Sequence, residues 1–97
     1  MRMHNPPHPG EFIVESYMKP FGLSCRYLAS QMDIAPSTLS RLLKGQSGIS
    51  PEMALRLSLC LGRSPESWLE MQHIYDLWIV GKRAHLGKVK KLDLDAA

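Results

Sequence analysis

Apolar residues return every three or four positions along residues 36–44, and this spacing predicts a short amphipathic helix. Leu39, Leu42 and Leu43 form its apolar face. Pro36 suits the first turn, and Gly45 suits the position just beyond the last turn. The opposite face carries small hydroxyls and cations: Ser37, Ser40, Arg41 and Lys44. A face of this composition is suited to contact with phosphates and base edges.

A second amphipathic pattern ends one tight turn before this helix. Ser24 is suited to cap its start. Its apolar face consists of Leu28, Ala29 and Met32. Two helices joined by a tight turn form the DNA-binding unit whose second helix enters the major groove. We therefore predict a helix-turn-helix in which the helix over residues 36–44 is the recognition helix.

Three further patterns complete an all-α fold of five helices. The first helix opens at Pro9 and is predicted to end at Pro20. The tripeptide Ser-Pro-Glu opens the other two, at residues 50–52 and 64–66. In this tripeptide serine caps the helix, proline suits the first turn and glutamate favours the helix dipole. The last helix is predicted to run to about Val80.

The chain of 97 residues is predicted to form a single domain. We expect an extended, proline-rich arm over residues 1–8, the helical domain over residues 9–80 and a basic tail over residues 81–97. Alternating apolar residues in the stretch VKKLDLD indicate either a short edge strand or a flexible tail. The basic residues of this tail either contact DNA or a protein, or are only solvated.

The last helix is apolar on two sides, which is more than one core of this size can bury. We therefore predict that one side packs against a second copy of the chain in a two-fold dimer. The alternative is that the tail folds back and covers this side. The predicted dimer residues are Trp68, Leu69, Leu77, Trp78 and Val80.

Composition and charge narrow the class of protein. The chain is 44% hydrophobic and 22% charged, as is usual for a soluble globular domain. Its apolar runs fall well short of the roughly 20 residues that span a bilayer. The first residues lack the apolar stretch of a secretory signal, so we predict a cytoplasmic protein without a membrane partner. The net charge of +3 is compatible with a nucleic-acid partner.

The side chains that most often carry out catalysis do not form a recognisable site. The histidines lack the spacing of metal ligands, and Ser37 and Ser40 have no base placed beside them by any known pattern. Cys25 and Cys60 lie in apolar helical patterns and are predicted to be buried, reduced thiols. We therefore predict a protein that is not an enzyme and that uses neither a metal nor a cofactor.

The central unit resembles the phage-repressor and Cro type of helix-turn-helix domain, known as the XRE family. The resemblance rests on Leu23-Ser24, Leu28-Ala29, Ile34, residues 37–42 and Gly45. Asp33 departs from the glycine that is usual in this family, but aspartate tolerates the left-handed conformation better than most residues. The resemblance implies a five-helix domain similar to that of the lambda repressor.

The flanking segments are similar to the HigA antitoxin branch of this family and to the proteins once named virulence-associated protein I. The matching features are Pro9-Gly10-Glu11, Trp68-Leu69, Gln72 and Asp76-Leu77-Trp78. The resemblance implies a homodimer that binds a palindromic operator in the double-stranded DNA of its own promoter. It also implies a partner toxin of the HigB type, an mRNA-cleaving ribonuclease that the protein neutralises.

Position by position, the resemblance places DNA contacts on the recognition helix and at the ends of neighbouring elements. Base contacts are expected at Pro36, Ser37, Ser40 and Arg41. Arg41 is foremost among them, because its guanidinium group can bond guanine twice. Phosphate contacts are expected at Thr38, Lys44, Ser24, Arg26 and Ser47. For Ser24, helix capping alone would also explain the residue.

Two other functions stay open at the level of the sequence. A stand-alone repressor of the same family would bind DNA without a toxin partner, and the neighbouring gene would distinguish it from an antitoxin. A protein-interaction module that has lost DNA binding would bind its partner without the salt dependence that phosphate contacts cause.

Overall fold

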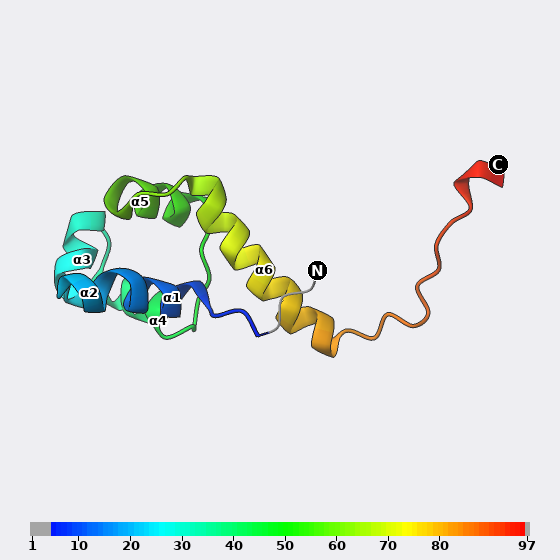
Figure 1. Ribbon diagram of the computed structural model, residues 1–97, viewed down its shortest axis with the longest axis horizontal. Helices are drawn as coiled ribbons and strands as arrows, with labels where there is room; N and C mark the ends of the chain where they lie inside the picture. Colours follow the sequence, from blue (N-terminus) through cyan, green and yellow to red (C-terminus); the bar gives the residue numbers. More distant parts are fainter. Residues whose placement is uncertain (1–4, 97) are drawn as a thin grey trace.

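A computed structural model describes residues 5–96, which fold into a helical domain with an extended tail (Figure 1). The first helix is continuous but has three parts, called α1, η1 and α2. The elements are α1 (Pro9–Ile13), η1 (Val14–Met18), α2 (Lys19–Phe21), α3 (Cys25–Met32), α4 (Pro36–Leu43), α5 (Pro51–Leu61), α6 (Pro65–Arg83) and the 3-10 turn η2 (Leu94–Ala96). The predicted all-α fold of five helices is confirmed.

Serine side chains cap three of these helices, as their sequence patterns predict. Ser24 Oγ accepts a hydrogen bond from the Tyr27 N–H at 3.1 Å, at the start of α3. Ser50 and Ser64 cap α5 and α6 in the same way. Because each cap satisfies a donor that the first turn leaves unpaired, these helix starts are defined by the local sequence.

The end of the first helix differs from the prediction, because Pro20 lies inside the helix. A proline there lacks an N–H and crowds the carbonyl four residues before it. The helix widens just ahead of it into the π turn η1, where the N–H of Lys19 donates to the carbonyl of Val14, five residues back. The helix ends at Phe21, after which Gly22 takes a left-handed φ of 64°.

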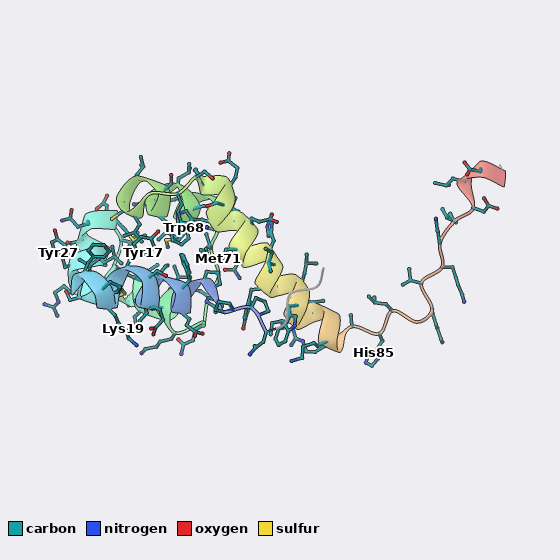
Figure 2. The ribbon with its side chains drawn as sticks, viewed as in Figure 1. Tyr17, Lys19, Tyr27, Trp68, Met71 and His85 are labelled. Atoms are coloured by element: carbon teal, nitrogen blue, oxygen red, sulfur yellow. The ribbon has the colours of Figure 1, made fainter. Side chains whose placement is uncertain are left out.

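The core of the domain lies between the helices and centres on Trp68 of α6, which is 0% exposed (Figure 2). Its indole N–H donates to the carbonyl of Gly62 at 2.9 Å, so the buried ring leaves no polar group unpaired. The rings of Phe12 and Tyr17 pack beside it. The buried hydrophobic residues are Ile13, Leu28, Ala29, Met32, Leu39, Leu42, Ile49, Ala54, Leu57 and Trp68.

The segment ahead of α1 is held to the domain within its described part. Pro6 is buried, and the His8 side chain caps α1 by accepting the N–H of Gly10 at 2.9 Å. Residues 1–4 of the predicted arm lie outside the described residues. The arm is therefore attached at residues 6–8, directly before the helical domain.

α6 continues past Gly81 to Arg83, three residues beyond the predicted end. A glycine ends a helix when it takes a left-handed conformation, and Gly81 keeps the helical one while Ala84 becomes extended. The second half of α6 projects from the domain, and the tail leads away from it (Figure 1). The alternative in which the tail covers α6 is thus not seen. Residues 84–93 contain no strand, and the stretch VKKLDLD ends in η2, so the possible edge strand is wrong.

Candidate nucleic-acid interface

α3 and α4 form a helix-turn-helix around a left-handed residue. Asp33 ends α3 with φ 57° and ψ 48°, and the N–H of Ile34 donates back to the carbonyl of Ala29. Aspartate therefore takes the conformation for which the family usually employs glycine, as the sequence predicts. The Cys25 thiol lies 3.6 Å from the Pro36 carbonyl and joins the starts of the two helices.

The recognition helix α4 turns its leucines to the core and its polar residues outward. Leu39 and Leu42 are buried, which fixes the rotation of the helix about its axis. The helix contains no carboxylate. Four of the predicted DNA-contact residues on and next to it are exposed, namely Pro36, Ser37, Arg41 and Lys44. The predicted residues Thr38 and Ser40 are half-buried.

The remaining predicted contacts lie at the ends of neighbouring elements. Arg26 is exposed in the first turn of α3. Ser24 accepts a bond as a cap, but its own hydroxyl proton stays available to a phosphate. Ser47 is half-buried in the loop that follows α4. The fold thus brings the ends of α3 and of this loop beside the recognition helix.

Arg56 of α5 supports the turn of the helix-turn-helix, a role that the spacing of residues along α5 does not reveal. Its Nη1 donates to the carbonyls of Met32 and Asp33, at 2.8 and 3.0 Å. Glu52, one turn earlier on α5, holds the same guanidinium at 2.8 Å. A cation at the carbonyl end of α3 also suits the helix dipole. The sequence signal was only a Glu and an Arg four residues apart, which is common on any exposed helix.

Gln72 of α6 supports the loop on the other side of the recognition helix. Its amide is buried, with Oε1 accepting the N–H of Ile49 at 2.8 Å and Nε2 donating to Asp76 at 2.9 Å. A Cβ on Gly48 would lie 3.0 Å from this amide, so the loop passes very close to α6. The resemblance had singled out Gln72 without a role, and the structure assigns it this loop.

The first helix contacts the carboxyl end of α4 at Gly10. A Cβ there would lie 2.0 Å from the Leu42 carbonyl oxygen and 2.9 Å from the Leu43 Cα. Only glycine permits this approach of one backbone to another. α1 therefore packs directly against the carboxyl end of the recognition helix.

The sequence comparisons agree with this arrangement. A family model described as helix-turn-helix matches residues 14–68, which is more than half of the chain. The uncharacterised HTH-type transcriptional regulator YddM of Escherichia coli K12 is 41% identical over 92 residues, covering 95% of this chain and 97% of YddM. Antitoxin HigA-1 of Vibrio cholerae is 36% identical over 73 residues, covering 75% of this chain and 69% of HigA-1. The chain belongs to the HigA branch of the XRE-type helix-turn-helix family.

Solved structures of HigA-like proteins share the whole fold. Antitoxin GraA is similar with a TM-score of 0.85 and 38% identity, and the match covers 95% of this chain and 99% of GraA. GraA in complex with its operator gives a TM-score of 0.85 at 37% identity, covering 95% of each chain. The matches therefore include the first helix and α6 in addition to the helix-turn-helix itself.

The predicted dimer residues of this HigA-like chain occupy different environments along α6. Trp68 belongs to the core and is fully buried within the single chain, so its predicted place on the dimer surface is wrong. Leu69 is half-buried against the core. Farther along α6, Leu77 is 73% exposed, and Val80 is also exposed. Trp78 is half-buried, with the Lys82 ammonium 3.9 Å from the centre of its ring.

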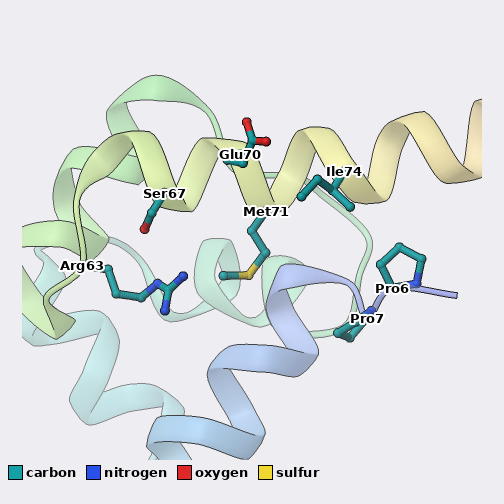
Figure 3. Close-up of a pocket in the computed structure, with 7 residues that line it drawn as sticks. All are labelled: Pro6, Pro7, Arg63, Ser67, Glu70, Met71 and Ile74. Carbon is teal, nitrogen blue, oxygen red and sulfur yellow. The ribbon is translucent and has the colours of Figure 1, made fainter. Parts of the chain in front are cut away.

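One groove lies away from the recognition helix, between α6 and the segment ahead of α1 (Figure 3). Its volume is about 250 Å³, and the Arg63 guanidinium at one end also lies 5.2 Å from the Phe12 ring centre. The lining residues are Pro6, Pro7, Arg63, Ser67, Glu70, Met71 and Ile74. The groove shares no residue with the predicted DNA contacts.

Over residues 5–96, no three side chains of histidine, cysteine, aspartate or glutamate gather where they would hold a metal ion. Within the same part of the chain, none of the helices combines the length and the hydropathy of a membrane span. Cys25 and Cys60 are free thiols, but both are half-buried, because each lies at the edge of its helix's apolar face and not at its centre. Partial burial raises the pKa of the Cys60 thiol, which favours the protonated and less reactive form.

Proposed function

We propose that this protein is a DNA-binding antitoxin that represses its own operon as a dimer and neutralises a HigB-type toxin. The observation that carries the DNA-binding part is the exposed polar face of α4 on a helix-turn-helix that matches antitoxin GraA in its operator complex. Operator DNA and the messenger RNA that a HigB-type toxin cleaves are both cytoplasmic, and so is the proposed place of action.

Arg41 is the proposed principal base reader. Its side chain is exposed on α4, and within the described residues it enters no ion pair. Its planar group can donate two hydrogen bonds to one guanine in the major groove. The proposed phosphate partners set the position of α4 on the duplex, and they are Ser24, Arg26, Thr38, Lys44 and Ser47.

The experiment is binding of the purified protein to the DNA directly upstream of its own gene, across a salt series. We expect tight binding that weakens steeply with salt, because phosphate contacts release counterions. Arg41→Ala is expected to cost about 1–3 kcal/mol and to relax the preference at one base position. Lys19→Ala is the control, since Lys19 lies on α2 and pairs with Glu15. Equal affinity of Arg41→Ala and wild type would contradict the assignment.

The antitoxin part needs its own test. Antitoxin HigA-1 and antitoxin GraA carry that role in their names, and their similarity to this chain supports it. Co-expression with the product of the adjacent gene is expected to restore growth and to give a complex that co-purifies. DNA binding without any such complex would leave a stand-alone repressor. Binding to a protein but to no DNA would leave an interaction module.

A further inference from the structure

His8 holds the start of α1 through a neutral ring nitrogen. Its Nδ1 accepts the N–H of Gly10 at 2.9 Å, and its backbone is extended, with φ −63° and ψ 143°. This is the geometry of a helix cap, made by an imidazole in place of a serine. The nitrogen must be unprotonated to accept this bond. The cap therefore exists only while His8 is neutral.

The same ring also lies against the loop that leaves the recognition helix. A Cβ on Gly45 would lie 3.7 to 4.0 Å from three ring atoms of His8, and the Ser47 backbone lies where it raises the pKa of the ring. On its other side the ring meets Tyr75 of α6 edge-on, with 4.9 Å between the ring centres. The imidazole is thus set between α6 and residues 45–47.

These residues are the continuation of the DNA-contacting face. The N–H of Gly45 donates to Leu42 and the N–H of Gln46 donates to Arg41, so the loop closes the end of α4. A displacement of the loop would move Lys44 and Ser47 relative to α4. Both are proposed phosphate partners, and the His8 ring lies beside the backbone of the loop that carries them.

We propose that His8 is a positioning residue for DNA binding, which fixes the loop after the recognition helix against α6 so that Lys44 and Ser47 meet phosphates. This inference rests on the proposed DNA-binding function. His8 itself does not contact the DNA. It acts through residues 45–47, and the Gly10 cap that orients its ring is intact while Nδ1 carries no proton.

Burial and the neighbouring charged groups together set the pKa of the His8 ring. Burial lowers the pKa of His8 below 6.5, and this effect outweighs the Ser47 backbone, Asp76 of α6 and Glu11 of α1, which raise the pKa. Tyr75 is the other titratable group in contact with the ring. Because the unfolded chain protonates first, the folded state loses stability as the pH falls below 6.5 towards the folded pKa. Protonation then removes the acceptor for Gly10.

His8→Asn tests this role, because asparagine caps a helix well but cannot fill the space between Gly45 and Tyr75. Ser64→Asn is the matched control, because it replaces one capping residue with another at the start of α6. In the free protein, the Gln46 amide is expected to exchange about tenfold faster in His8→Asn, while the Ala54 amide of α5 stays unchanged. At pH 7.5, binding to the upstream DNA is expected to weaken about tenfold, with a salt slope lower by about 1.

The pH series separates positioning from simple loss of stability. As the pH falls from 7.5 through the folded pKa of His8, the affinity ratio of wild type to His8→Asn is expected to approach one, because the protonated ring loses the Gly10 cap that orients it beside the loop. Tyr75→Leu removes the facing ring without touching the cap, and it is expected to have the same effects. It serves as the test if His8→Asn folds poorly. Unchanged Gln46 exchange, or an affinity equal to wild type at pH 7.5, overturns the proposal. Failure of the wild type to bind the DNA would instead reject the proposed function, while the exchange measurement still decides the role of His8 in the loop.

Discussion

Single residues of this protein join segments that lie far apart in the sequence. Gln72 reaches the loop before α5, and Arg56 reaches the turn between α3 and α4. Both satisfy backbone groups that no regular secondary structure would pair. Each contact pairs a backbone group that would otherwise cost free energy if it were buried without a partner. Each contact also holds its loop or turn in one position.

Arg56→Met tests whether the contacts of Arg56 stabilise the turn between α3 and α4, since methionine keeps the aliphatic stem and removes the donors. We expect the free energy of unfolding to fall by about 1–2 kcal/mol, because two carbonyls at the end of α3 lose a charged donor. Urea denaturation measures the change.

Glu52→Gln is the control for this variant. It removes the exposed ion pair with Arg56 but leaves the donors to Met32 and Asp33 in place. An exposed pair of this kind contributes at most about 1 kcal/mol. If both variants lost the same stability, the contacts to the turn would have no role of their own.

At the scale of elements, the recognition helix is held at both of its ends. α3 and the Asp33 turn set its start, and α1 packs on its carboxyl end through Gly10. The buried leucines of α4 then fix which face turns outward. The polar face is therefore presented by a rigid scaffold, which is what a base-reading helix requires.

Gly10→Ala is expected to break the contact between α1 and α4. The added methyl would meet the Leu42 carbonyl oxygen at 2.0 Å, and the two backbones would have to separate. Overpacking of this kind costs about 1–3 kcal/mol or more. The melting temperature and the urea midpoint should both fall.

Gly81→Ala in α6 gives the matched comparison, because nothing lies within 4 Å of the added methyl. Alanine is the better helix former by up to about 1 kcal/mol, so this variant should gain stability. We expect Gly10→Ala to lower the free energy of unfolding and Gly81→Ala to raise it. A stabilising Gly10→Ala would show that α1 and α4 are not in close contact.

On the scale of the whole molecule, the apolar residues that the core does not bury lie mostly toward the carboxyl end. Leu77 and Val80 are exposed on the projecting half of α6, and the tail beyond it exposes Leu86 and Val89. Exposed apolar residues that lie close together mark an interaction surface in many proteins. We propose that a second copy of the chain covers the α6 residues, as a dimer on a palindromic operator requires.

Leu77→Asp tests the dimer directly. Leu77 is 73% exposed in the single chain, so the monomer should keep its fold. Each dimer would lose two buried leucines and gain two buried charges. We expect the dimer dissociation constant to rise at least about a hundredfold, as measured by analytical ultracentrifugation.

Leu59→Asp is its control, because Leu59 is 90% exposed on α5, away from the proposed surface. This variant should remain as dimeric as the wild type. A dimer that survives Leu77→Asp but not Leu59→Asp would move the interface to α5.

Local patterns in the sequence were sufficient to predict the helices and their order. Capping serines, first-turn prolines and the spacing of leucines act within a few residues, so they can be read without knowledge of the fold. The outward face of α4 follows from the same spacing. This is why Arg41 and Lys44 were predicted to be exposed, and they are.

The tertiary structure alone decided what depends on contacts between distant segments. The π turn keeps Pro20 inside the first helix, and the core takes Trp68 away from any partner surface. His8 and Arg56 acquire their roles only where α6 and α3 come beside them. Nothing in the spacing of a single segment records these contacts, because packing brings together residues whose separation along the chain has no fixed period.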